Sequence, residues 1–115
     1  MRSEDKIKLA LIWSTFSFYH VARFKALHKR MSDMVLGIEI AGSENDLGLD
    51  SWVYPKREGL PIVTLFPERD LRLISEAEMA SKIINKLESW GAGAVFVSGY
   101  AQLRYRLIID WAKEE

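Results

Sequence analysis

Side chains that can hydrogen-bond or stack on a ligand are most concentrated in a short segment from Ser14 to His20. It directly follows an apolar run and combines hydroxyl groups, an imidazole and flat aromatic rings. Such side chains hold sugars and other polyols by hydrogen bonding and stacking, and a few convergent polar groups with little charge are typical of a small-molecule cleft. We therefore take this segment as the first part of a candidate binding site.

Further candidates follow other apolar runs of the chain, near Ala41 and Ser98. In an open α/β sheet the carboxyl ends of the strands meet along one rim, and ligands bind in the crevice beyond it. We predict one shared rim of substrate-binding residues and assign no catalytic residue. The predicted substrate-binding residues are Ser14, Thr15, Phe16, Tyr19, His20, Ser43, Gly99, Tyr100 and Gln102.

Several residues of the first segment also have a purely structural interpretation. Phe16 and Tyr19 are equally well explained as core or helix-staple residues. Ser17 is a natural N-cap for a following helix. His20 would lie near that helix N-terminus, where the helix dipole disfavours the imidazolium, so we expect a neutral, hydrogen-bonding histidine.

Four short apolar runs are predicted to be strands, and their nearly continuous hydrophobicity indicates burial on both faces. These runs are Ile7 to Trp13, Met34 to Ala41, Leu60 to Phe66, and Ala94 to Ser98. Helical spacing of apolar residues predicts a helix over His20 to Arg30 and another over Gln102 to Glu114. A third is bounded by a capping box of Ser75 and Glu78 and by Gly91 after its last turn.

Each predicted helix presents one apolar stripe to the core. The stripes are Val21, Phe24, Leu27 and Met31; Met79, Ile83, Leu87 and Trp90; and Leu103, Leu107, Ile108 and Trp111.

The alternation of strands and helices predicts an α/β fold. The 115 residues suit a single domain. Right-handed crossovers then favour a Rossmann-like three-layer α/β/α arrangement with a mostly parallel sheet of about four strands in the order 3-2-1-4. The stretch from Gly42 to Gly59 has no clear helical pattern, and a short helix or an antiparallel hairpin there would alter the topology.

The composition excludes several classes of protein. Lys plus Arg and Asp plus Glu both number 16, so the basic footprint of a general nucleic-acid binder is missing. No apolar run approaches the roughly 20 residues that cross a bilayer, and no secretory signal pattern is present. The chain contains no cysteine, which removes thiolate chemistry and fits a reducing compartment, so we expect a cytoplasmic protein.

No known metal or phosphate motif fits the sequence. Glu44, Asp46 and Asp50 lie close together, but the glycine and glutamate of a calcium loop are not at the required positions. Gly91 and Gly93 follow a predicted helix and precede a predicted strand, which is the wrong context for a dinucleotide fingerprint. We expect no metal and no bound cofactor.

Several segments together resemble one known family. The run IWSTFSFYHVARFKAL, then VLGIEIAG, PIVTLFP, an acidic capped helix and AVFVSGY are similar to the N-terminal domain of the GT-B glycosyltransferases of family 4. The resemblance extends from Lys6 to Trp111, and its most specific parts are YHVARFKAL, GIEIAG and VSGY.

This resemblance implies an acceptor-binding domain of a retaining glycosyltransferase that uses a nucleotide-sugar donor without metal. It implies that Ser14 to His20 form the first loop of the cleft and that Gly99, Tyr100 and Gln102 line the same cleft. The first loop lacks the Gly-Gly pair of many members, and the donor-binding C-terminal domain is absent from the 115 residues. We therefore expect a sugar or glycolipid acceptor, a donor domain supplied in cis or in trans, and no transfer by this chain alone.

Two other interpretations stay open. A stand-alone α/β interaction or regulatory module fits the same architecture, although the first strand ends without the acidic cluster of a phosphoacceptor domain. A small hydrolase that uses His20 lacks a recognisable nucleophile and orienting acid. A homo-oligomer is compatible with either of the first two hypotheses, because an open sheet edge would expose apolar surface.

Overall fold

The computed structural model describes residues 7–14, 16–41, 59–67, 69, 71–97 and 103–114. The predicted loop from Gly42 to Gly59 lies outside this part of the chain, apart from Gly59 itself. The elements follow the predicted order, with two short 3-10 turns added at Ser32–Met34 and Leu71–Leu73. They are β1 (Leu9–Trp13), α1 (Phe18–Met31), β2 (Val35–Ala41), β3 (Ile62–Phe66), α2 (Glu76–Trp90), β4 (Ala94–Val97) and α3 (Leu103–Glu114).

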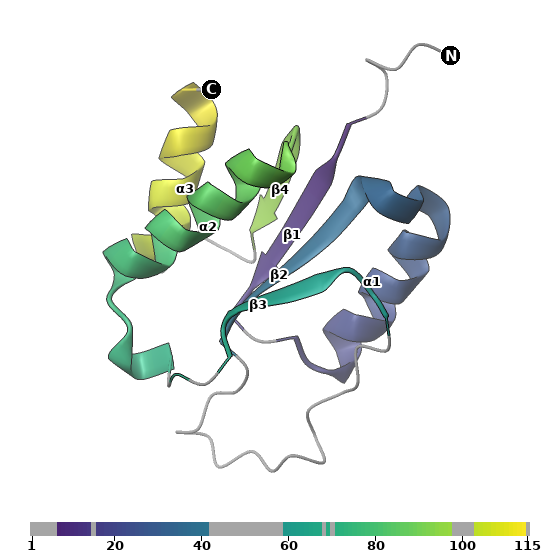
Figure 1. Ribbon diagram of the computed structural model, residues 1–115, viewed down its shortest axis with the longest axis horizontal. Helices are drawn as coiled ribbons and strands as arrows, with labels where there is room; N and C mark the ends of the chain where they lie inside the picture. Colours follow the sequence, from purple (N-terminus) through teal and green to yellow (C-terminus); the bar gives the residue numbers. More distant parts are fainter. Residues whose placement is uncertain are drawn as a thin grey trace.

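The four described strands form one parallel sheet in the order β3-β2-β1-β4, which confirms the predicted α/β class and strand order. Trp13 at the end of β1 pairs with Glu39 of β2, and Glu39 in turn pairs with Thr64 of β3. Figure 1 shows α1 on one side of the sheet and α2 and α3 on the other. The arrangement is a Rossmann-like three-layer domain.

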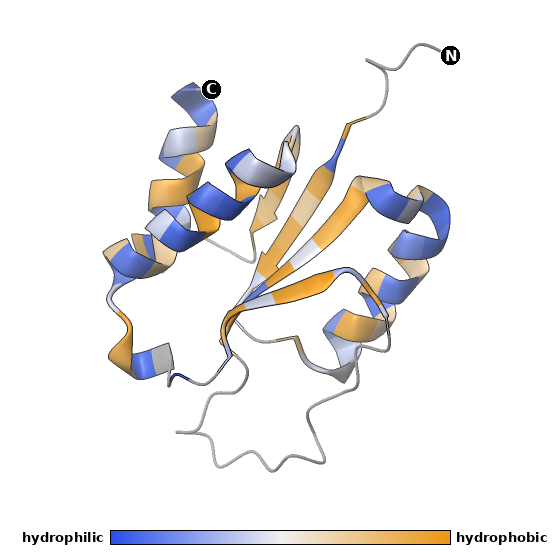
Figure 2. Ribbon diagram, in the orientation of Figure 1, coloured by the Kyte–Doolittle hydropathy of each residue, from blue (hydrophilic) through white to orange (hydrophobic). Residues whose placement is uncertain are grey.

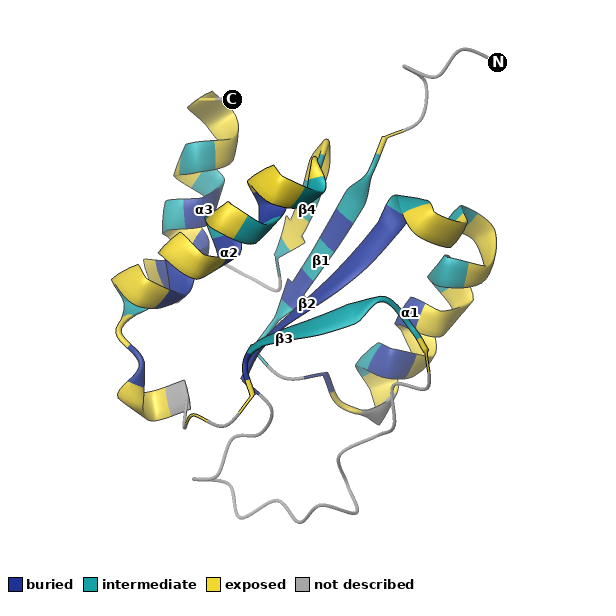
Figure 3. Ribbon diagram, viewed as in Figure 1, coloured by how far each residue is buried: buried dark blue, intermediate teal, exposed yellow. Residues whose placement is uncertain are grey.

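Two apolar clusters pack on the opposite faces of the sheet. On the side of α2 and α3, Ala10 and Ile12 of β1 join alternate residues of β2 in the larger cluster. On the side of α1, Phe16, Val21, Phe24 and Val35 form the smaller one. Strand β2 is buried along its whole length and is the centre of the domain (Figure 3). Figure 2 shows the same contrast in hydropathy, with mostly apolar strands and helices that are polar on their outer sides.

The prediction that all four strands are covered on both faces is wrong for β4. Val95 and Val97 pack on the larger cluster, but Ala94 and Phe96 are exposed, and 49% of Phe96 is accessible. The smaller cluster includes residues of β1, β2 and β3 but none of β4. Among the described residues, α1 therefore covers the sheet only as far as β1.

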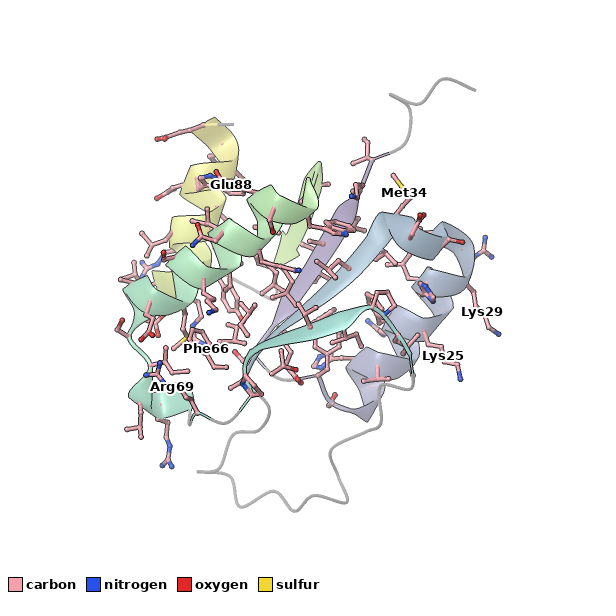
Figure 4. All side chains as sticks on the ribbon, in the orientation of Figure 1. Lys25, Lys29, Met34, Phe66, Arg69 and Glu88 are labelled. Atoms are coloured by element: carbon pink, nitrogen blue, oxygen red, sulfur yellow. The ribbon has the colours of Figure 1, made fainter. Side chains whose placement is uncertain are left out.

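Local capping explains where the helices begin and end. Ser17 accepts a hydrogen bond from the His20 amide, so α1 begins at Phe18, two residues before the predicted start. Ser75 accepts one from the Glu78 amide, and Gly91 adopts the predicted left-handed conformation at φ 83° after α2. Figure 4 shows Lys25 and Lys29 extending from the outer side of α1, away from the sheet.

The predicted stripes of α1 and α2 are confirmed as core-facing residues, although Leu27, Met31 and Trp90 are only partly buried. The stripe of α3 is partly wrong. Leu103 is 45% exposed, whereas Arg104 and Tyr105 are buried together with Ile108. The helix is rotated from its apolar stripe because Arg104 finds an ionic partner on α2 and can be buried there.

Past the end of β3 the chain is held against α2. Arg69 forms an ion pair with Glu78 at 2.8 Å, and its guanidinium lies 5.4 Å from the ring centre of Phe66. Figure 4 shows Phe66 and Arg69 in this connection. Within the described part of the chain, no helix is long and apolar enough to cross a membrane.

Candidate functional site

The connections that leave β1 and β4 run to opposite faces of the sheet. The chain after β1 leads to α1, and the chain after β4 leads to α3 on the other side (Figure 1). Ligands of open parallel sheets bind at such a switch point, beyond the carboxyl ends of the two strands. Ser14, the first residue after β1, lies at this point, and α3 begins beside it.

The main chain of Ser14 is held by β2. Its carbonyl oxygen accepts hydrogen bonds from the amides of Ile40 and Ala41 at 3.1 and 3.0 Å. The end of β1 is thus fixed relative to the end of β2. The side chain of Ser14 is directed to the other partner, α3, and it is only half-buried.

The Ser14 hydroxyl is held by two groups from α3. Its Oγ lies 3.2 Å from Nη1 of Arg104, which donates, and 3.1 Å from the hydroxyl of Tyr105. Tyr105 is 1% exposed, and in its bond with Ser14 either hydroxyl can be the donor. The Ser14 hydroxyl thus accepts from Arg104 and shares a further hydrogen bond with Tyr105, and both contacts fix its position.

Arg104 is itself fixed by Glu76 at the start of α2. Nε and Nη2 of the guanidinium each lie 3.1 Å from a different oxygen of the carboxylate, a bidentate arrangement. The Arg104 amide donates a third bond to Glu76 Oε1 at 2.8 Å. Burial alone would raise the pKa of the Glu76 carboxyl, but the hydrogen bonds and the charge of Arg104 outweigh it and lower that pKa.

The described contacts of Ser14 suit the binding of a polar ligand. A serine nucleophile needs an adjacent base, and the groups that the described residues place on Ser14 Oγ are a guanidinium, which donates, and a phenol. What the arrangement presents is an oriented hydroxyl beside a buried positive charge. Such a group suits an uncharged hydroxyl or a carbonyl oxygen of a ligand.

Aromatic side chains lie on the α1 side of the same rim. The rings of Trp13 and His20 are stacked, with centroids 4.5 Å apart. The Ser17 amide donates to Nδ1 of His20 at 3.2 Å, so Nδ1 carries no proton in this bond. That geometry agrees with the neutral, hydrogen-bonding histidine expected near the helix N-terminus, and Ser17 is the N-cap that the sequence suggested.

The remaining predicted site residues are one exposed residue, one buried residue and a group that lies outside the described part of the chain. Tyr19 is 59% exposed, and its hydroxyl and ring both contact the Arg23 guanidinium. Phe16 is fully buried and belongs to the smaller core cluster, which is the structural interpretation of that residue. The residues outside the described part are Thr15, Ser43, Gly99, Tyr100 and Gln102.

Sequence reasoning missed the polar residues that organise this rim. Arg104, Tyr105 and Glu76 were given no role, and Glu39 was placed within a predicted apolar strand. Glu39 had a visible signal, because it is a charged residue within a continuous apolar run. Arg104 and Glu76 had none, since ordinary charged residues in first helical turns are usually solvated.

The described residues contain no group of three or more His, Cys, Asp or Glu side chains that could hold a metal ion. The acidic cluster of Glu44, Asp46 and Asp50 lies outside them. Comparison with protein-family models, with curated proteins and with solved structures gives no match for this chain.

Proposed function

We propose that this chain is the acceptor-binding domain of a retaining glycosyltransferase of the GT-B type that uses a nucleotide-sugar donor. The observation that carries the proposal is the Ser14 hydroxyl, which is oriented by Arg104 and Tyr105 at the switch point of a Rossmann-like sheet. The resemblance of the sequence to family 4 supports the same assignment.

The proposed acceptor is a sugar or a glycolipid headgroup. Sugar hydroxyls both donate and accept hydrogen bonds, so one of them can accept from Ser14. The partly buried rings of Trp13 and His20 offer a surface against which a sugar ring can pack. Thr15, Ser43, Gly99, Tyr100 and Gln102 are proposed to complete the site, and a cytoplasmic location is part of the same proposal.

The chain by itself is proposed to bind acceptor weakly and to transfer nothing. In a GT-B enzyme the donor occupies a second domain, which would face the rim described above. Catalysis would then require that domain, either on a longer chain or on a separate one. Turnover of a nucleotide sugar by the purified 115 residues would contradict this part of the proposal.

A saccharide titration followed by NMR tests the binding site. We expect amide shifts to be concentrated around Ser14, Trp13 and His20 for at least one member of a panel of methyl glycosides. S14A should reduce that binding. The matched control is S89A, because Ser89 is exposed on α2 and its hydroxyl donates only to the Lys86 carbonyl. Equal binding by S14A and the unaltered chain would contradict the proposed role of Ser14.

One observation favours a second function, a protein-interaction module without catalysis. The exposed face of β4 presents Phe96, which is 49% accessible and lies 5.6 Å from the Trp13 ring. Large exposed aromatic residues often mark protein interfaces. In the saccharide titration, amide shifts that are confined to β4 and α3, and are absent from the rim for every saccharide, would favour this alternative.

A further inference from the structure

Glu39 is a fully buried carboxylate in the middle layer of the domain. It lies on β2 between Trp13 of β1 and Thr64 of β3, on the face that α1 covers. Burying a carboxylate is costly unless hydrogen bonds compensate for the lost hydration. The compensation that Glu39 receives therefore indicates what the residue does.

The two carboxylate oxygens of Glu39 bind two different parts of the chain. Oε2 accepts from the Phe16 amide at 2.7 Å, and Oε1 accepts from the Thr64 hydroxyl at 2.8 Å. The first bond reaches the connection between β1 and α1, and the second reaches the neighbouring strand. A buried amide that loses its acceptor is costly to leave unsatisfied, so the 2.7 Å bond to Oε2 holds the Phe16 amide in place.

Gly37 lies two residues before Glu39, on the same face of β2, and makes room for a residue of the same loop. A Cβ at this position would lie 3.1 Å from Cζ of Phe16 and 3.0 Å from Cγ1 of Ile62, both too close for an ordinary contact. The ring of Phe16 occupies that space and is completely buried. Gly37 thus accommodates the ring while Glu39 binds the amide of the same residue.

The residue held in this way is close to the candidate site. Phe16 is two positions after Ser14, whose carbonyl oxygen is bound by Ile40 and Ala41 of the same strand. Strand β2 therefore holds the chain on both sides of position 15. Ser14, which carries the oriented hydroxyl, cannot shift without breaking one of these hydrogen bonds.

We propose that Glu39 is a positioning residue for the site, which together with Gly37 fixes Phe16 and so holds Ser14 at the rim. The proposal rests on the proposed function for its ligand, but its first consequence is structural. Glu39 acts through the Phe16 amide and has no contact with the ligand. Thr64 extends the arrangement to β3 by holding the carboxylate in place.

Amide hydrogen exchange and NMR shifts of the full chain test this role directly. In E39Q the Phe16 amide keeps only a neutral side-chain acceptor. Its proton resonance should therefore move upfield, and its hydrogen should exchange with solvent several-fold faster. E39M removes the Glu39 acceptor altogether, and exchange at Phe16 should rise about tenfold or more. The amide of Ile38, in the centre of β2, reports general destabilisation. The matched control is E88Q, because Glu88 is exposed on α2.

Thr64 gives a second test should the Glu39 variants fold poorly. T64V keeps the shape of the side chain but removes the donor to Oε1, so the carboxylate loses one anchor and the Phe16 resonance should shift. T64S keeps the hydroxyl and should restore the original resonance. The proposal is overturned by a Phe16 amide that is unaffected in all these variants, or by equal acceleration at Phe16 and Ile38.

The saccharide titration separates this role from the function it serves. If both proposals hold, E39Q weakens saccharide binding while E88Q does not. A Phe16 amide released by E39Q in a chain that binds no saccharide would support the positioning role and contradict the acceptor assignment. Undiminished saccharide binding by a variant whose Phe16 amide is released would overturn the link between Glu39 and the site.

Discussion

Arg104 and Glu76 join the first turns of α3 and α2 through three hydrogen bonds, two from the guanidinium and one from the Arg104 amide. The carboxylate lies at a helix N-terminus, where the dipole favours it, whereas Arg104 is in the first turn of its own helix, where a cation is disfavoured. Glu76 offsets that cost for Arg104. The pair therefore fixes the two helices relative to each other and orients the side chain that reaches Ser14.

The lowered pKa of Glu76 predicts how stability depends on pH. A carboxyl whose pKa is lower in the folded state stabilises the fold above its ordinary value of 4.5, and this contribution is lost as the pH falls through the folded value. The difference in unfolding free energy between the unaltered chain and E76Q should be constant near neutral pH and shrink at acid pH. Denaturant unfolding at several pH values measures it, with E88Q as the control. A difference that is independent of pH would contradict the prediction.

Replacing Arg104 with lysine should cost stability although the charge is kept. Lysine cannot reproduce the bidentate contact with Glu76 and also reach Ser14, so we expect R104K to lose about 1–3 kcal/mol of unfolding free energy. Arg106, an exposed residue of the same helix, supplies the control. Urea denaturation should place R106K within about 0.5 kcal/mol of the unaltered chain. Equal effects of the two variants would show that the Glu76 contact contributes little.

Removing the hydroxyl of Tyr105 should release the side chain of Ser14. Y105F keeps the buried ring but deletes the hydrogen bond with Ser14 Oγ, so we expect a loss of about 1 kcal/mol and weaker saccharide binding. S89A is the comparison, since Ser89 is exposed on α2. Thermal unfolding and the saccharide titration measure the two effects. Unchanged binding by Y105F would mean that Tyr105 does not orient the site.

Adding a methyl group at Gly37 should destabilise the domain through crowding rather than through backbone strain. The new Cβ would lie 3.0 Å from Ile62 and 3.1 Å from Phe16, and displacing such contacts costs about 1–3 kcal/mol. The paired variant G37A/F16L removes the ring and should recover part of the loss. Denaturant unfolding of the single and double variants checks this coupling. Strict additivity of the two substitutions would exclude contact between Phe16 and position 37.

The fold could be predicted from the sequence because its main signals are local. The apolar runs place β1 to β4 within two residues of their observed limits, and Ser75 and Gly91 mark the ends of α2 by their own hydrogen bonding and backbone conformation. With right-handed crossovers assumed, the strand order predicted from the sequence is the observed one. The side-chain types of the segment after β1, together with its position after an apolar run, made it a candidate site.

The polar connections of the site depended on contacts between residues far apart in the chain. Ser14 and Arg104 are separated by 90 positions, Glu76 and Arg104 by 28, and Phe16 and Glu39 by 23. No local pattern marks such pairs, because a charged residue looks the same in sequence whether it is solvated or buried with a partner. The rotation of α3, which buries Arg104 and exposes Leu103, followed from that partner. The sequence by itself thus determined the strands, the helices and the rim, while only the tertiary structure decided which buried charges orient the residues on it.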